Sequence, residues 1–178
     1  MVEMLGVLAI IGVLSVGGIA GYSMAMSKFK ITKTINQVQT IITNLRTLYA
    51  SQRKYEKALP ASAAYNMGVL TDEIYDGSKG LNPYGGTIEF GIANSNRNWT
   101  IKYTQLTSEA CLKPVTADWG ADASSGLVSI GAGGKGSVTT TYTWTGTDKL
   151  PPELISATTA CAGDSTGANT AVEEWTFR

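Results

Sequence analysis

The feature that most constrains this chain is an uncharged run of 24 residues, positions 4–27, that lies between Glu3 and Lys28. At about 1.5 Å of rise per residue, a helix of this length crosses the roughly 30 Å hydrocarbon core of a bilayer. A secretory signal peptide has a basic start, a shorter apolar stretch and a small-residue cleavage site, and this chain has the wrong flanks for one. The run therefore predicts a helix that lies in lipid or in an equally apolar assembly.

The rest of the chain is long enough for one ordinary domain, because about 150 residues can bury a core. The formal net charge of 0 and the 16% share of charged residues argue against a nucleic-acid partner held by phosphate neutralisation. Lys28, Lys30 and Lys33 follow the apolar run, and the positive-inside rule would place this side in the cytoplasm. The cysteines point outward instead, and three lysines are a modest bias.

The chain has only two cysteines, Cys111 and Cys161, and no histidine. Two cysteines 50 positions apart do not have the spacing of zinc ligands, so a metal site is not expected. A disulfide in an oxidising compartment is the favoured interpretation, and closing such a loop would stabilise the fold by about 4 kcal/mol. The alternative is a pair of buried free thiols.

A second helical pattern follows the apolar run without a proline before Pro60. Apolar residues recur at alternating spacings of four and three, which places them on one face of a helix. They are Ile31, Ile35, Val38, Ile42, Leu45 and Tyr49, with Ile41 and Leu48 widening the stripe. We expect one helix of about 50 residues, ending near Tyr55, whose second half lies on a soluble domain. A coiled coil is the competing interpretation, but about three heptads without clear flanking charge pairs are too few to favour it.

From residue 56 onward, turn residues separate short apolar segments. We expect a short helix at 70–75, a turn at 82–86, a hairpin of strands 87–92 and 99–103, and a helix capped by Thr107 before Pro114. Further strands are expected at 127–130, 138–144 and 172–177. The chain is thus predicted to be α+β: a long amino-terminal helix, apolar over 1–27 and amphipathic over 28–55, with a head at 56–178 built on a small antiparallel sheet.

Motifs for chemistry are weak. Asn98-Trp99-Thr100 matches a glycosylation acceptor but begins a predicted strand, and the glycine-rich segment 131–136 lacks the ending of a phosphate-binding loop, so we interpret it as a flexible loop. No histidine can act as a base, no serine or cysteine has an identifiable activating partner, and no carboxylate pair stands out. We therefore expect neither an enzyme nor a cofactor.

Several glycines interrupt the apolar run. Gly17 and Gly21 form a small-xxx-small pair that lets another helix approach closely. Gly17-Gly18 can also mark a place where the helix melts, and ordinary membrane-helix glycine is the alternative.

The opening sequence, Met1-Val2-Glu3-Met4-Leu5-Gly6-Val7-Leu8-Ala9-Ile10-Ile11-Gly12-Val13-Leu14, resembles the amino terminus of type IV pilins, in which a glutamate precedes a long apolar helix. This match is specific, because a lone acid is expensive at the edge of a membrane span. The layout of the head resembles the type IVb branch and the bundle-forming pilins of enteric bacteria. The shared features are Asn82-Pro83-Tyr84-Gly85-Gly86 before the first strand of the hairpin, Cys111 just after the hairpin, and Cys161 near the carboxyl end.

The resemblance implies that the subunit occupies two environments in succession, the inner membrane and the filament. A leader is removed, the new amino group is often methylated, and the subunit waits in the inner membrane with its head outside before the assembly machinery builds it into a helical filament. Glu3 would pair with a neighbouring subunit's amino terminus, so that neither charge is buried alone. The family places this glutamate two residues further from the mature amino end, which predicts either two preceding residues or an unusual processing site. The implied assembly residues are Glu3, Met4, Leu5, Val7, Leu8, Ile10, Ile11, Leu14, Gly17, Gly18 and Gly21.

The predicted function is therefore that of a structural subunit, the major pilin of an extracellular type IV pilus used for adhesion, aggregation or motility. Its expected partners are further copies of itself, the inner membrane and the assembly machinery, with no nucleic acid in the structural role. The rival predictions are a pseudopilin of a type II secretion system and a membrane-anchored monomeric adhesin.

Overall fold

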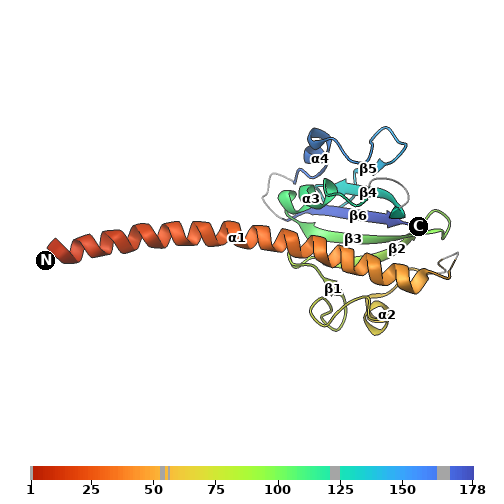
Figure 1. The fold of residues 1–178 in the computed structure, drawn as a ribbon, viewed down its shortest axis with the longest axis horizontal. Coiled ribbons are helices and arrows are strands. Elements are labelled where there is room, and N and C mark those ends of the chain that lie inside the picture. The colour runs from red at the N-terminus through yellow and green to blue at the C-terminus, as the bar shows by residue number, and fades with distance from the viewer. Residues whose placement is uncertain (1, 53–54, 56, 121–124, 164–168) are drawn as a thin grey trace.

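The computed structural model describes residues 2–52, 55, 57–120, 125–163 and 169–178. One helix, α1 (Val2–Tyr49), runs for 48 residues, and its second half lies along a head built from all the remaining elements (Figure 1). The predicted single helix is confirmed, but its expected end near Tyr55 is wrong. After Tyr49 the chain turns, and the backbone N–H of Tyr55 donates to the carbonyl of Asn96 at 2.8 Å, while the Tyr49 and Tyr55 rings meet edge to face at 4.7 Å.

The head contains a six-stranded sheet in which every neighbouring pair is antiparallel. The spatial order is β1 (Gly80–Leu81), β2 (Thr87–Ala93), β3 (Asn98–Leu106), β6 (Ala171–Phe177), β4 (Leu127–Gly133) and β5 (Thr140–Thr143). The last strand of the chain therefore lies inside the sheet and joins its two halves. The predicted α+β class with an antiparallel sheet is confirmed.

Helix α1 covers one face of this sheet with the predicted stripe. Its buried residues are Ile31, Thr34, Gln37, Val38, Ile41, Ile42 and Leu45. Leu48, expected in the stripe, is 39% exposed, and Ile35 and Tyr49 are only partly buried. The opposing sheet surface is mostly aromatic and is formed by Trp99, Ile101, Tyr103, Trp175 and Phe177, each at most 3% exposed.

Among the described residues, the head also has three short α-helices: α2 (Ala61–Asn66), α3 (Ser108–Val115) and α4 (Leu154–Ala160). The predicted cap of α3 is confirmed, because the Thr107 hydroxyl accepts from the N–H of Ala110 at 3.1 Å. The helix expected at 70–75 is wrong. That segment forms a single turn on the carbonyl of Thr71, and the helix lies earlier, starting directly after Pro60.

The turn at 82–86 is confirmed and rests on the Asn82 side chain. Its amide donates to the carbonyl of Thr104 at 2.7 Å, and its oxygen accepts from the N–H groups of Tyr84 and Gly86. Gly86 is required there, because a Cβ would lie 1.9 Å from the Thr104 carbonyl oxygen.

The prediction of a flexible loop for the glycine-rich segment 131–136 is wrong for the first part of that segment. Residues 131–133 continue β4 and are buried. A Cβ on Gly133 would lie 1.7 Å from the carbonyl oxygen of Ser137, so glycine here permits a close approach of two backbones. The glycosylation triplet is also excluded as an accessible acceptor, because Asn98 is 4% exposed and lies in β3.

Candidate functional site

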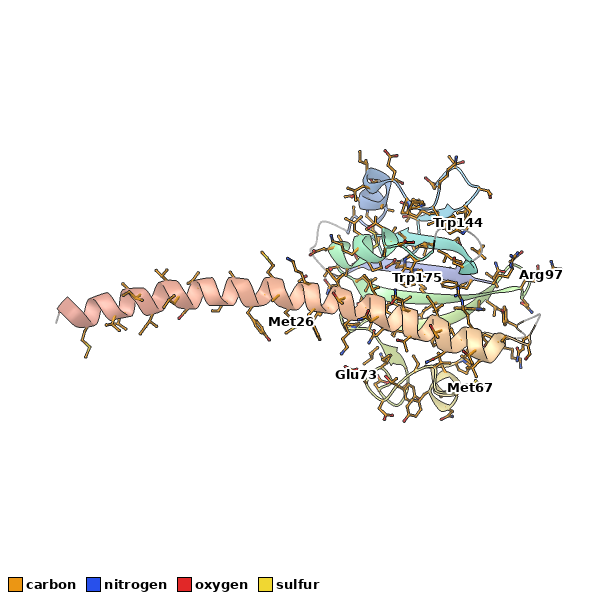
Figure 2. All side chains as sticks on the ribbon, in the orientation of Figure 1. Met26, Met67, Glu73, Arg97, Trp144 and Trp175 are labelled. Carbon is orange, nitrogen blue, oxygen red and sulfur yellow. A yellow bond between two sulfur atoms is a disulfide. The ribbon has the colours of Figure 1, made fainter. Side chains whose placement is uncertain are left out.

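The first half of α1 projects from the head, with its side chains directed outward on every side (Figure 2). Its large apolar side chains are between 54% and 75% exposed: Met4, Val7, Leu8, Ile10, Ile11, Val13, Leu14, Val16, Ile19, Tyr22, Met24 and Phe29. By length and composition, this helix is also the one among the described residues that could span a membrane. No part of the described head covers it.

This exposure is too costly for a protein surrounded by water. Burying one large apolar side chain contributes about 2 kcal/mol, so the side chains of this surface amount to some 20 kcal/mol or more of unrealised burial. The projecting half of α1 therefore needs apolar surroundings that the chain itself does not supply.

The structure places the predicted assembly residues on this projecting surface where it describes them. Met4, Val7, Leu8, Ile10, Ile11 and Leu14 are exposed. Gly17, Gly18 and Gly21 lie within a continuous helix, and a Cβ built on any of them meets nothing within 4 Å. The backbones of Glu3 and Leu5 belong to α1, but their side chains lie outside the described part, so the pairing of Glu3 stays a prediction.

A polar collar fixes the point where α1 reaches the head. Lys33 forms an ion pair with Glu73, and the ammonium of Lys30 lies 5.6 Å from the ring centroid of Tyr84. On the other side, the Ser27 hydroxyl donates to Glu109 at 3.5 Å. The sequence showed the lysines but not their partners, because each partner comes from a distant part of the chain.

The predicted disulfide is confirmed. Cys111 in α3 and Cys161 at the end of α4 are joined, with their Cα atoms 5.7 Å apart, and both residues are at most 1% exposed. The bond ties α4 to a helix that packs on the sheet, which fixes the edge of the head formed by the carboxyl-terminal third. The alternative of two free thiols is excluded.

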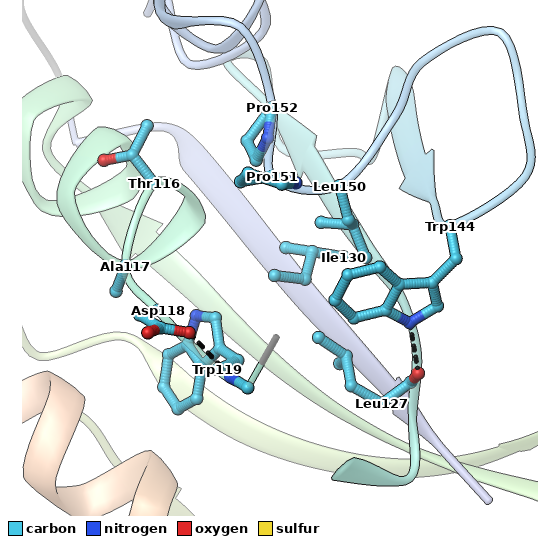
Figure 3. A pocket seen from close by; sticks show the side chains of 11 residues that line it. Thr116, Ala117, Asp118, Trp119, Leu127, Ile130, Trp144, Leu150, Pro151 and Pro152 are labelled. Atoms are coloured by element: carbon cyan, nitrogen blue, oxygen red, sulfur yellow. Dashed lines mark hydrogen bonds between the residues drawn. The ribbon is translucent and has the colours of Figure 1, made fainter. Parts of the chain in front are cut away.

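The head also contains an apolar pocket of about 360 Å³, with the two indoles of Trp119 and Trp144 on its walls (Figure 3). Both rings are held in place, because their N–H groups donate to the carbonyls of Pro114 and Leu127, each at 2.7 Å. Asp118 is the ionisable residue among the described lining, and its carboxylate accepts from the N–H of Gly120. The described lining residues include no nucleophile beside a base, so these residues can bind a ligand but offer no catalytic pair.

Metal chemistry finds no support in the part of the chain that the structure describes. Within those ranges, no three histidine, cysteine, aspartate or glutamate residues come together.

A long apolar helix that leaves an α+β head with a disulfide-bounded edge is the architecture of a type IV pilin. The solved structure of TcpA, a type IV pilin from Vibrio cholerae El Tor biotype, matches this fold with a TM-score of 0.56 at 15% identity, over 84% of this chain and 99% of that one. The family model described as PilS N terminal matches residues 28–175, so this chain belongs to that family of type IV pilin-like proteins. No curated protein sequence matches the chain.

Proposed function

We propose that this protein is the major pilin of a type IV pilus of the type IVb branch, which polymerises through α1 into an extracellular helical filament for adhesion, aggregation or motility. The observation that carries the proposal is the projecting half of α1, apolar on all sides and uncovered by its own head. Membership of the PilS N-terminal family and the pilin fold support it.

The helix would meet two apolar environments in succession. Before assembly it spans the inner membrane, for which its length is sufficient. The head lies outside at that stage, where an oxidising compartment forms the bond between Cys111 and Cys161. After extraction, the same surface packs against the helices of neighbouring subunits in the filament core.

The glycines of α1 support helix–helix packing as their role. Among the described residues of the chain, nothing lies near Gly17 or Gly21 that would require the absence of a side chain. In membranes and bundles, small residues four apart allow two backbones to approach closely. The partner that needs this space is therefore outside the chain, and a second copy of α1 is the partner that a filament supplies.

Glu3 would set the axial position of each subunit during assembly. Its charge is compensated if it meets the amino terminus of the adjacent subunit, and a subunit shifted along the axis would leave it buried alone. This pairing would favour one axial position for each incoming subunit.

The test is to shear cells that express the chain, image the released material and sequence its protein from the amino end. Long filaments composed of this chain support the proposal. Short assemblies confined to the periplasm would identify a pseudopilin, and a chain that is extracted only with detergent and never as filaments would identify an anchored monomer, such as an adhesin. Either of the last two results would overturn the proposal.

A further inference from the structure

The centre of the head buries an acid that has no partner. Glu173, in the middle of β6, is 0% exposed, and neither of its carboxyl oxygens has a hydrogen-bond partner. Its register neighbours are Tyr103 on β3 and Ala132 on β4. The Tyr103 hydroxyl is equally buried and equally unpartnered, so two unpartnered polar groups are register neighbours in one buried layer.

This layer is the contact between the sheet and α1. The guanidinium carbon of Arg46 lies 5.2 Å from the ring centroid of Phe177, which fixes the alignment of α1 with β6, and the two elements run in the same direction (Figure 1). Residues on one face of a strand alternate with residues on the other, so Glu173 faces the same side as Phe177.

The same alignment places Gln37 at the height of Glu173 along the sheet, but on the opposite flank of α1 from Arg46, because nine residues turn a helix by about 2.5 turns. Gln37 precedes Arg46 by nine helical residues, and Glu173 precedes Phe177 by four strand residues. At the rise per residue of a helix and of a strand, both separations are about 13.5 Å along the axis. Gln37 is 9% exposed, and its side-chain oxygen has no hydrogen-bond partner.

No described cation faces Glu173. On α1, Lys33 pairs with Glu73, and Arg46 lies over Phe177 with its guanidinium bonded to the carbonyl of Ser125.

The other packed elements add no positive charge either. On the sheet, Lys102 and Glu174 are register partners one position along from Tyr103 and Glu173, and thus lie on the opposite face. The buried residues of α3 are Ala110, Cys111, Pro114 and Val115, none of which carries a charge.

We propose that Glu173 keeps its proton in the folded head. This buried neutral acid makes the stability of the packing between the sheet and α1 depend on pH, so that the packing is most stable in acid and less stable as the pH rises. An isolated carboxylate at this position would be far more costly than a neutral acid. The inference concerns the folded chain itself and holds whether or not the chain polymerises.

The direction of the effect follows from linkage. Burial raises the pKa of Glu173 well above its usual value of 4.5. Below pH 4.5 the acid is neutral in both states and the full stability is present. Above it the unfolded chain releases a proton that the folded chain retains, so the unfolding constant rises about tenfold per pH unit until the folded-state pKa is reached. Burial also raises the pKa of Tyr103, so its hydroxyl stays neutral. A tyrosine carries no positive charge in either state and cannot compensate a carboxylate at Glu173.

The experiment uses the full chain solubilised in detergent, unfolded by urea at pH 4 to 8 and followed by tryptophan fluorescence. Glu173→Gln is expected to match the unmodified chain at pH 4, to exceed its stability at pH 8, and to lose the steep rise of the unfolding constant with pH. The matched control is Glu174→Gln, one residue along the same strand on the opposite face. Burial raises the pKa of Glu174 too, while Lys102 lowers it, so this variant is expected to keep the larger part of the rise, which comes from Glu173. Equal pH profiles for the unmodified chain and Glu173→Gln would overturn the proposal.

If Glu173→Gln does not fold, a second measurement on the unmodified chain tests the proposal. In the unmodified chain, infrared spectra are expected to retain the band of a protonated carboxylic acid at pH 7. A chain whose carboxyl groups are all ionised at pH 7 would also overturn the proposal.

Discussion

Cys111 and Cys161 close a loop of 50 residues that contains β4, β5 and α4, while β6, which pairs with β4, follows after the bond. The disulfide thus encloses β4 and β5, and this part of the sheet is joined to the rest only when β6, the last strand, pairs with β4. The stability of that part should depend on the disulfide more than on any single contact.

Replacing both cysteines by serine is expected to lower the free energy of unfolding by about 4 kcal/mol, the loop-closure term for this length. Urea unfolding of the detergent-solubilised chain measures it. The unmodified chain under reducing conditions is the matched control and should lose a similar amount. An unchanged unfolding midpoint in the variant would show that the bond is dispensable.

Glu3→Ala is expected to leave membrane insertion intact, because it removes a charge at the edge of the span, and to abolish filaments, because the axial position of each subunit is no longer set. Membrane fractionation and electron microscopy of sheared material check the two halves of this prediction. Glu3→Asp, which keeps the charge, is the control and should retain some filaments. Normal pili from Glu3→Ala would contradict the assigned role.

Enlarging Gly21 should harm assembly without harming the subunit. The site is open in the single chain, so Gly21→Leu is expected to change the unfolding of the head by less than about 0.5 kcal/mol. If another helix packs there, filament yield should fall about tenfold or more, since 1.4 kcal/mol of lost packing already gives that factor. Quantified sheared pilin measures the yield, Gly21→Ala should have a smaller effect, and the volume-conserving Ile19→Leu is the control. Wild-type yields from Gly21→Leu would remove the packing argument.

Gly133→Ala is expected to destabilise the head by about 3 kcal/mol, because the added methyl group would meet the Ser137 carbonyl and the backbone must shift. Urea unfolding measures the loss. Gly12→Ala adds the same group in open space on α1 and should leave the unfolding of the head unchanged. Equal stability of the two variants would mean that the two backbones can separate at little cost.

The sequence predicts those parts of this fold that local patterns encode. The periodicity from Ile31 to Leu45 predicts the face of α1 that is buried, and Asn82 with its following proline and glycines predicts the turn. The position of β6 inside the sheet depends on pairings with strands far away in the chain, which no local pattern shows.

Residues that depart from local patterns are the ones whose place in the structure cannot be predicted from the sequence. Gly131 and Gly133 are residues typical of a loop, yet they lie in β4. Glycine is needed at these positions because Val138 and the Ser137 carbonyl lie too close to leave room for a side chain. The buried, partnerless state of Glu173 is also invisible in the sequence, since an acid in a strand usually faces solvent. For the assembly surface, the exposed apolar residues could be predicted, whereas their partners lie in other molecules.

The most direct test of the central claim is electron cryo-microscopy of sheared filaments. A bundle of helices along the filament axis that is formed by residues 4–27 of many copies, with the heads outside, is the predicted result. Filaments whose core lacks these residues, or a helix that remains in the membrane while filaments form from another protein, would contradict the account.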